Sequence, residues 1–268
     1  MPTPIMSAPM RSGFPTMPPV TEAQWAELTK AVLPVGDLGS ADDPVVVAAP
    51  HPDDETLGVG GLIATMARAG RSVQVVTITD GEASHPGVAG LAARRANEQG
   101  RALAALGVAR PALRLRFPDG AVPQHVGAIT DALVAHLGPR TLLLAPWRGD
   151  GHPDHDAVGA AARAASIATG CRLLSYPVWL WQWATHAETS MLRLRRADLD
   201  EAARAAKAAA VACFESQIEE RHGPPILTAP ALVRAARPYE VVIEDPAGPD
   251  SAAGLRLVTS QPRLADRG

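Results

Sequence analysis

Residues 44–55 read PVVVAAPHPDDE, and this stretch decides the fold that the sequence predicts. Its first half is a continuous run of β-branched and small apolar residues, which is typical of a strand buried on both faces. The second half changes at once to a proline-constrained turn that carries an imidazole and three carboxylates. We therefore expect a central strand over residues 44–50, with polar side chains gathered at its carboxyl end.

Strand and helix patterns alternate along the chain after this stretch. Further strands are expected over residues 72–79, 112–117, 140–146 and 171–176, and helices over residues 57–69, 91–106, 126–137 and 156–169. Such regular alternation is typical of βαβ units, which build parallel sheets. The sequence thus predicts a Rossmann-like α/β fold with three α/β/α layers and a mostly parallel sheet.

The chain is expected to form one large domain between two short end segments. We place an N-terminal tail and short helix in residues 1–40, the domain in residues 41–245 and a C-terminal tail in residues 246–268. The elements expected late in the domain are a Trp-rich strand at residues 179–183, a basic strand at residues 191–196, a long helix at residues 199–215 and a short strand at residues 240–243. These elements should complete the sheet edge and wall the site.

Composition excludes several classes of partner. The 268 residues include 25 Lys and Arg against 28 Asp and Glu, so the formal net charge of -3 offers no positive field to a nucleic acid. No window holds the roughly 20 apolar residues that a bilayer crossing needs, and no signal peptide is recognisable. Two cysteines without a neighbouring thiolate fit a reducing compartment. We expect a cytoplasmic protein, and a homo-oligomer is left open.

The first polar cluster is APHPDDE at residues 49–55. In a parallel α/β sheet, ligands bind at the carboxyl ends of the strands, where this cluster lies. The turn places His51 and Asp54 so that both side chains face one ion, while Asp53 between them faces the same cavity. The alternative for Asp53 is a helix cap without a chemical role.

The second cluster is WRGDGHPDH at residues 147–155, again between an expected strand and an expected helix. This cluster supplies a third ligand to the ion that His51 and Asp54 face. Three ligands drawn from His and Asp, with a fourth position open to water, are typical of catalytic zinc. Zinc lowers the pKa of bound water to about 7. Either cluster alone would pass for a solvated turn or a helix cap, but two at equivalent places in one alternating fold favour a metal site.

These two motifs resemble those of a known family, the PIG-L or LmbE-like deacetylases, with the order of elements similar over residues 44–217. Members of that family deacetylate N-acetylglucosaminyl lipids, mycothiol and bacillithiol precursors and glycopeptide antibiotic intermediates. The resemblance implies that His51, Asp54 and His155 bind one zinc ion per chain. It also implies that Asp53 is the general base and that His152 is a general acid or an oxyanion stabiliser.

Two further residues resemble positions through which the family binds sugar. Arg95 opens an Arg-x-x-Glu motif on a helix, and Asp119 lies in the segment FPDG at residues 117–120. The resemblance implies that Arg95 reaches the sugar and that Asp119 holds sugar hydroxyls. The alternatives are a helix-surface pair of Arg95 with Glu98 and a turn begun by Asp119.

Other features leave their roles open. Trp179, Trp181 and Trp183 alternate along the expected strand, so that one face would present indoles to a sugar, or would pack against the core or a second subunit. Lys207 and the pair Ser216 and Gln217 resemble the family's last helix without a role that follows.

The function that the resemblance implies is zinc-dependent hydrolysis. The substrate would be an N-acetylglucosamine-like sugar conjugate, and the products acetate and a free amine. Two alternatives stay open at this point: a metal-dependent amidase or acetyl esterase acting on another small molecule, and a catalytically silent sugar-binding module. A silent module is disfavoured because every position that matches a catalytic role holds a competent residue.

Overall fold

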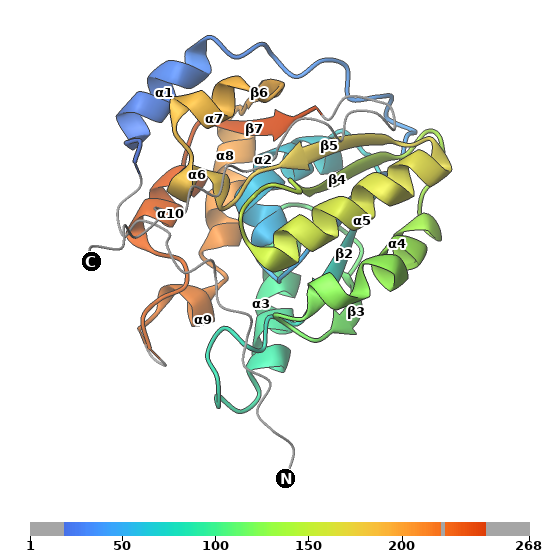
Figure 1. Ribbon diagram of the computed structural model, residues 1–268, viewed down its shortest axis with the longest axis vertical. Helices are drawn as coiled ribbons and strands as arrows, with labels where there is room; N and C mark the ends of the chain where they lie inside the picture. The colour runs from blue at the N-terminus through green and yellow to red at the C-terminus, as the bar shows by residue number, and fades with distance from the viewer. Residues whose placement is uncertain (1–18, 221–222, 245–268) are drawn as a thin grey trace, which may run out of the picture.

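The computed structural model describes residues 19–220 and 223–244, and a single seven-stranded sheet runs through them (Figure 1). The strand order is β3-β2-β1-β4-β5-β7-β6. The strands are β1 (Val45–Ala49), β2 (Val73–Thr79), β3 (Leu113–Phe117), β4 (Leu142–Pro146), β5 (Arg172–Tyr176), β6 (Leu194–Asp198) and β7 (Tyr239–Ile243). The pairs among β3, β2, β1, β4 and β5 are parallel, whereas β7 pairs antiparallel with β5 and β6. The predicted α/β class with a mostly parallel sheet is confirmed.

Helices cover both faces of this sheet. They are α1 (Glu22–Lys30), α2 (Asp54–Arg68), α3 (Leu91–Ala105), α4 (Val126–Val134), α5 (Pro153–Thr169), α6 (Leu180–Trp183), α7 (His186–Ser190), α8 (Glu201–Val211), α9 (Glu215–Ile218), α10 (Ala229–Ala235) and the 3-10 helix η1 (Val122–His125). Helices α4 and α5 pack together on one face, and α2, α3 and α8 on the other (Figure 1). Alternate residues of β1 therefore enter different cores, Val47 facing α2 and Val46 facing α5.

Two helices begin three residues earlier than their hydrophobic periodicity predicts. Helix α2 starts at Asp54 and α5 at Pro153, so the polar motifs themselves form the first helical turns. The apolar pattern misses these turns because their side chains are polar although several are buried. The strands that precede both motifs lie where the sequence predicts them.

The long helix expected over residues 199–215 is wrong, because the structure holds two helices there. Asp200 caps α8 by accepting a hydrogen bond from the Ala203 N–H at 2.8 Å. The chain then leaves helical geometry at Phe214, whose side chain is fully buried, before α9 starts. Burial of this ring in the core explains the turn between α8 and α9.

The expected Trp-rich strand is also wrong, because residues 180–183 form the short helix α6. The carboxylate of Asp150 accepts hydrogen bonds from the backbone N–H groups of Val178, Trp179 and Leu180 at 2.8–3.2 Å. Successive N–H groups converge on one anion when the backbone coils into a helix start, not when it extends. The basic strand expected at residues 191–196 is present as β6, which covers Leu194–Asp198 instead.

Helix α1 lies against the antiparallel end of the sheet. It opens with a capping box between Thr21 and Gln24, and Trp25 is buried against Trp181 and Tyr239. The boundary that we place between residues 40 and 41 stays a prediction, and the tail expected at residues 246–268 lies outside the described residues. None of the helices in residues 19–220 and 223–244 has the length and apolar character that a bilayer crossing needs.

Close packing of α5 on the β4 loop generates a stability prediction. A Cβ at Gly159 would lie 2.6 Å from the backbone nitrogen of Arg148 and 2.6 Å from the carbonyl oxygen of Pro146. Backbone atoms have little room to shift, so Gly159→Ala should lower the free energy of unfolding by about 1–3 kcal/mol. Thermal denaturation measures this loss. Gly100→Ala is the control, because nothing lies within 4 Å of its Cβ and α3 should gain about 0.5–1 kcal/mol. Equal stability of the two variants would contradict the packing argument.

Candidate active site and metal centre

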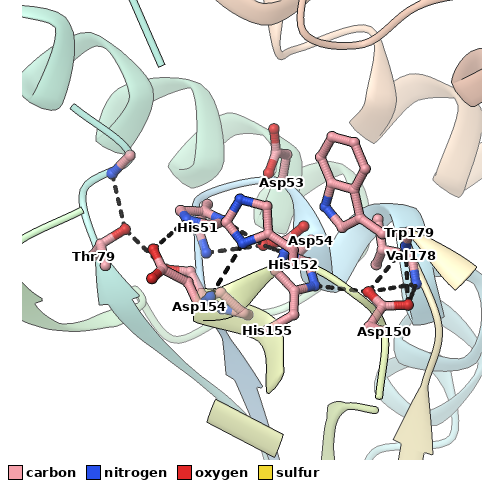
Figure 2. Close-up of polar contacts among 12 residues, drawn as sticks. His51, Asp53, Asp54, Thr79, Asp150, His152, Asp154, His155, Val178 and Trp179 are labelled. Atoms are coloured by element: carbon pink, nitrogen blue, oxygen red, sulfur yellow. Dashed lines mark hydrogen bonds and ion pairs between the residues drawn. The ribbon is translucent and has the colours of Figure 1, made fainter. Parts of the chain in front are cut away.

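The two polar motifs meet at the carboxyl ends of β1 and β4, which are neighbours in the sheet (Figure 2). His51 and Asp54 follow β1, and His155 lies in the first turn of α5 after β4. The Asp54 Oδ2 atom lies 3.1 Å from His51 Nδ1 and 3.2 Å from His155 Nε2. One ligand atom from each of these residues falls within 4.8 Å of the other two. The structure thus brings the three expected ligands together.

Carboxylates hold the outer nitrogen of each imidazole. His155 Nδ1 lies 2.9 Å from Asp150 Oδ2, and His51 Nε2 lies 3.1 Å from Asp119 Oδ1 and 3.3 Å from Asp154 Oδ2. Metal-binding histidines are held in this way, with the second ring nitrogen bonded to a carboxylate so that the first faces the ion. The arrangement leaves His155 Nε2 and His51 Nδ1 facing Asp54.

The donor set fits zinc. Among the described residues, the buried His155 Nε2 has no hydrogen-bond partner, although Asp54 lies beside it. A buried nitrogen in this state is costly unless it binds something else. Two imidazoles and one carboxylate are the ligands of many catalytic zinc sites. A second group, His51, His152 and Asp154, also has ligand spacing and shares His51 with the first. In that group, however, His152 Nδ1 already accepts the Asp154 N–H at 3.2 Å.

The electrostatics of the cluster favour positive charge between the carboxylates. Burial acts to lower the pKa of His155, but the charges of Asp54 and Asp150 raise it to about 9. Burial also opposes protonation of His51, yet its hydrogen bonds to three carboxylates raise its pKa well above the ordinary value. Burial acts to raise the pKa of Asp54, but the charges and hydrogen bonds of His155 and His51 together hold it well below its ordinary value. In the metal-free chain, protons on His51 and His155 therefore supply the positive charge that a bound cation would otherwise supply.

Asp53 occupies the N-cap position of α2 but makes no capping hydrogen bond with its side chain. The interpretation of Asp53 as a side-chain helix cap is therefore wrong. Its backbone φ of 153° is strained for a residue with a Cβ, and such strain is typical of functional sites. The buried carboxylate lies 3.1 Å from Arg95 Nη2. Burial raises the pKa of Asp53 to about 7 against the opposing charge of Arg95.

Arg95 reaches from α3 to the turn that holds Asp53. Its guanidinium donates to the carbonyl oxygens of Gly81 at 2.8 Å and Pro52 at 3.2 Å, and its side chain is 3% exposed. The alternative of a surface pair with Glu98 is wrong. Glu98 is buried and instead accepts hydrogen bonds from Arg94 and from the backbone N–H and side chain of Ser216. A contact of Arg95 with sugar stays a prediction.

Asp119 follows β3 and faces the metal cluster. Beside its contact with His51, it accepts a hydrogen bond from the Ala83 N–H at 2.8 Å. Burial acts to raise the pKa of Asp119, but His51 lowers it to about 2, which keeps the carboxylate ionised. Its contacts orient His51, and a role in holding sugar hydroxyls stays a prediction.

His152 is the N-cap residue of α5. With Nδ1 occupied by the Asp154 N–H, the Nε2 atom is left for other partners. The ring stacks on Trp179 with 5.6 Å between centroids and 29° between planes. Burial, together with the charges of His155 and His51, lowers the pKa of His152 to about 3. His152 is thus a neutral imidazole in the wall of the cavity.

The three tryptophans do not share one face. Trp181 packs edge-on against Trp25 at 5.0 Å, which fits the core-packing alternative. The Trp183 Nε1–H donates to the backbone oxygen of Asp150 at 2.7 Å. Trp179 lies against His152 in the cavity wall. Of the three indoles, those of Trp179 and Trp181 line the cavity, so a stacking surface for sugar would consist of these two.

Sequence reasoning missed two carboxylates of the second motif. Asp150 bonds to His155 and to the backbone N–H groups of Val178 and Trp179 (Figure 2), and also to that of Leu180. Asp154 bonds to the Gly120 N–H at 2.8 Å and lies beside His51. A signal existed, because both acids lie within five residues of the expected ligand His155. Sequence spacing alone does not separate an acid that binds a metal from one that orients a ligand.

The cluster opens into a cavity of about 720 Å³. His51, Asp53, Asp119 and His152 lie in its wall at the metal end. The remaining wall comes from the segment around α6, from α8, from residues 225–235 and from β7. A cavity of this size suits a small-molecule substrate.

Comparison with known proteins finds similar sequences and folds. Residues 46–166 match the PIG-L family model, described as GlcNAc-PI de-N-acetylase. A 1D-myo-inositol 2-acetamido-2-deoxy-alpha-D-glucopyranoside deacetylase of Tsukamurella paurometabola is 35% identical over 168 residues, which is 48% of this chain and 57% of the relative. The enzyme of the same description from Mycolicibacterium gilvum is 36% identical over 136 residues, 39% of this chain and 48% of the relative. The chain spans about half the length of these curated relatives.

Solved structures share the fold. The pseudoaglycone deacetylase Dbv21 superposes with a TM-score of 0.59 at 24% identity, covering 75% of this chain and 96% of that protein. A conserved protein of Thermus thermophilus gives a TM-score of 0.54 at 26% identity, covering 71% of this chain and 84% of its own. These likenesses extend the similarity beyond the residues that the family model matches.

The contact between Asp150 and His155 generates a prediction about metal affinity. Asp150→Asn leaves one acceptor oxygen for His155 and three backbone N–H groups, so the imidazole should lose its fixed orientation. Zinc affinity should fall by about 10- to 100-fold, the usual effect of removing a carboxylate that holds a metal-binding histidine. Titration calorimetry measures it. Asp131→Asn, an exposed acid on α4, is the control, and equal affinities of the two variants would contradict the assigned role.

Proposed function

We propose, from the match of residues 46–166 to the PIG-L family model, that this chain is a zinc-dependent N-deacetylase acting on an N-acetylglucosamine-like sugar conjugate. The observation that carries the proposal is the buried cluster of His51, Asp54 and His155, with the Asp53 carboxylate beside it and outside the ligand set. Curated relatives that deacetylate an acetamido sugar support the substrate class.

The metal would be held by His51, Asp54 and His155, one ion per chain. When bound, zinc supplies Lewis acidity and lowers the pKa of water at the site to about 7. Asp119 and Asp150 fix the two imidazoles from outside. These contacts keep the ligand nitrogens aimed at one point before substrate arrives.

Asp53 is the general base in this proposal. It takes a proton from the attacking water as the water oxygen bonds to the acetyl carbon. Arg95 restrains the carboxylate through an ion pair and holds the carbonyl of Pro52 in the same turn. A cation on the neighbouring ligands would lower the pKa of Asp53 in the same direction as Arg95, which keeps the base ionised.

His152 supplies the remaining polar contact to the acetamide. Because its Nδ1 accepts the Asp154 N–H, the neutral ring carries its proton on Nε2. This N–H would donate a hydrogen bond to the developing oxyanion. Because the ring is neutral, the proton that the leaving nitrogen needs would come from Asp53, which took it from the attacking water. Cleavage of the C–N bond then gives acetate and the free amine.

A substrate screen tests the function directly. Acetate release is measured on N-acetylglucosamine conjugates that differ at the anomeric substituent, beside O-acetyl sugars and simple N-acetyl amides. Release from the N-acetyl sugars supports the proposal. Turnover of O-acetyl sugars or simple amides alone would replace it with an esterase or amidase, and metal binding without any turnover would point to a silent sugar-binding module.

The third ligand is tested by metal content. His155→Ala should lose bound zinc, because two ligands remain of three and the buried Asp54 loses its second partner. Elemental analysis of the purified protein gives the ratio of zinc to chain, and His136→Ala, an exposed histidine after α4, serves as the control. Full zinc occupancy in His155→Ala would make His152 the third ligand instead.

The role of Asp53 is tested by a variant that keeps its shape. Asp53→Asn should retain zinc and fold while kcat falls by about 10²- to 10⁴-fold, the usual contribution of a positioned general base. Acetate release and zinc content are measured on the same preparation, and thermal denaturation checks the fold. Turnover near that of the parent protein with zinc bound would rule out Asp53 as the base.

A further inference from the structure

A kink divides helix α2 shortly after the turn that carries the metal ligand. Val59 has φ -140° and ψ 23°, outside helical geometry, although helical residues lie on both sides. The flanking glycines fit the close packing of this region. A Cβ at Gly58 would lie 2.3 Å from the ring of Tyr176, and one at Gly61 would lie 2.4 Å from Leu199. The first segment of α2 carries Asp54, and the second continues into the core.

A buried ion pair bridges this kink. In a regular helix the Gly61 N–H donates to the Leu57 carbonyl, four residues earlier. Here the N–H groups of Gly61 and Leu62 donate to the Glu240 carboxylate at 2.7 and 2.8 Å. The Leu57 carbonyl accepts a hydrogen bond from Lys207 Nζ at 2.9 Å. Lys207 Nζ and Glu240 Oε1 lie 2.7 Å apart, which closes the bridge.

The charges of the pair match the polarity of the two helix segments. Glu240 bonds to N–H groups at the start of the second segment, where a helix end favours an anion. Lys207 bonds to a carbonyl at the end of the first segment, where a cation is favoured. The side chains are 4% and 1% exposed, so the charges of Lys207 and Glu240 are matched by each other and by these backbone groups.

A short chain of hydrogen bonds connects this pair to the catalytic turn. Lys207 holds the carbonyl of Leu57, and the Leu57 N–H donates to the Asp53 carbonyl at 2.9 Å. Asp53 has the strained backbone described above, which persists only where neighbouring groups restrain it. Asp54, the next residue, is the shared carboxylate of the metal cluster.

We propose that Lys207 and Glu240 are positioning residues that set the direction of the first turn of α2 and so hold Asp54 and Asp53 in place for the metal. The pair touches neither the ligand atoms nor the reacting groups, and it acts through the backbone of α2. This inference rests on the metal site of the proposed function.

The experiment compares Lys207→Met and Glu240→Gln with the parent protein. Zinc dissociation constants are measured by competition with a chelating dye, and the visible absorption of the Co²⁺-loaded proteins reports the geometry of the ligands. Both variants should bind zinc about 10- to 100-fold more weakly than the parent and show an altered Co²⁺ spectrum. Ile63→Val is the control, because it removes a buried methyl group from the same helix without touching the pair.

The outcomes separate positioning from stability alone. If Lys207→Met and Glu240→Gln lower the Tm but keep the zinc affinity and Co²⁺ spectrum of Ile63→Val, the pair is structural and the inference is overturned. Lys207→Met leaves both backbone bonds to Glu240 available, so it decides the question if Glu240→Gln fails to fold. Failure of the parent protein itself to bind zinc or Co²⁺ would overturn the proposed function first, since the parent carries the unaltered pair.

Discussion

The buried carboxylate of Asp54 lies between two imidazoles, and the need to balance buried charge there shapes its surroundings. An unpaired buried ion costs several kcal/mol, so every charged group must find a partner or a metal. His51 and His155 face Asp54 from two sides, and each is held from behind by further carboxylates. Negative groups thus exceed the permanent cations at this sheet edge. A bound divalent cation would balance this excess of negative charge and leave the histidines neutral.

The same constraint explains why residues distant in sequence converge on the turn after β1. Arg95 arrives from α3 to pair with Asp53, and Lys207 arrives from α8 to pair with Glu240 beside α2. Each cation also donates to a backbone carbonyl close to this turn, Arg95 to that of Pro52 and Lys207 to that of Leu57. Helices on this face of the sheet therefore do more than cover the core. They carry the positive charges that fix a turn whose backbone is strained.

Local pattern is sufficient to predict the parts of the fold where burial and periodicity agree. The strands that end at Ala49 and Pro146 are continuous apolar runs, and the polar motifs after them come together at one edge of the sheet. Prediction fails where a distant group decides the conformation. Residues 178–180 belong to a stretch with the alternation of a strand, but their N–H groups bind the Asp150 carboxylate and the chain there starts a helix. Burial of Phe214 interrupts a helical pattern that is continuous in the sequence. The first segment does not contain Asp150, and the second does not show the core that buries Phe214.

In the proposed function, chemistry and specificity would come from different parts of the chain. The segment that matches the PIG-L family model, residues 46–166, supplies the candidate metal ligands, Asp53, Arg95 and His152. Much of the rest of the cavity wall comes later, from residues 177–182, from α10 and from β7. Helix α10 is tied to α6 by a hydrogen bond from Arg234 to Gln182 at 3.2 Å. In the proposed reaction the acetamide would lie at the metal, so the substituent on the sugar would extend toward this later wall. In this proposal, residues 46–166 would carry out the reaction, and the later elements would select the substituent that the sugar carries.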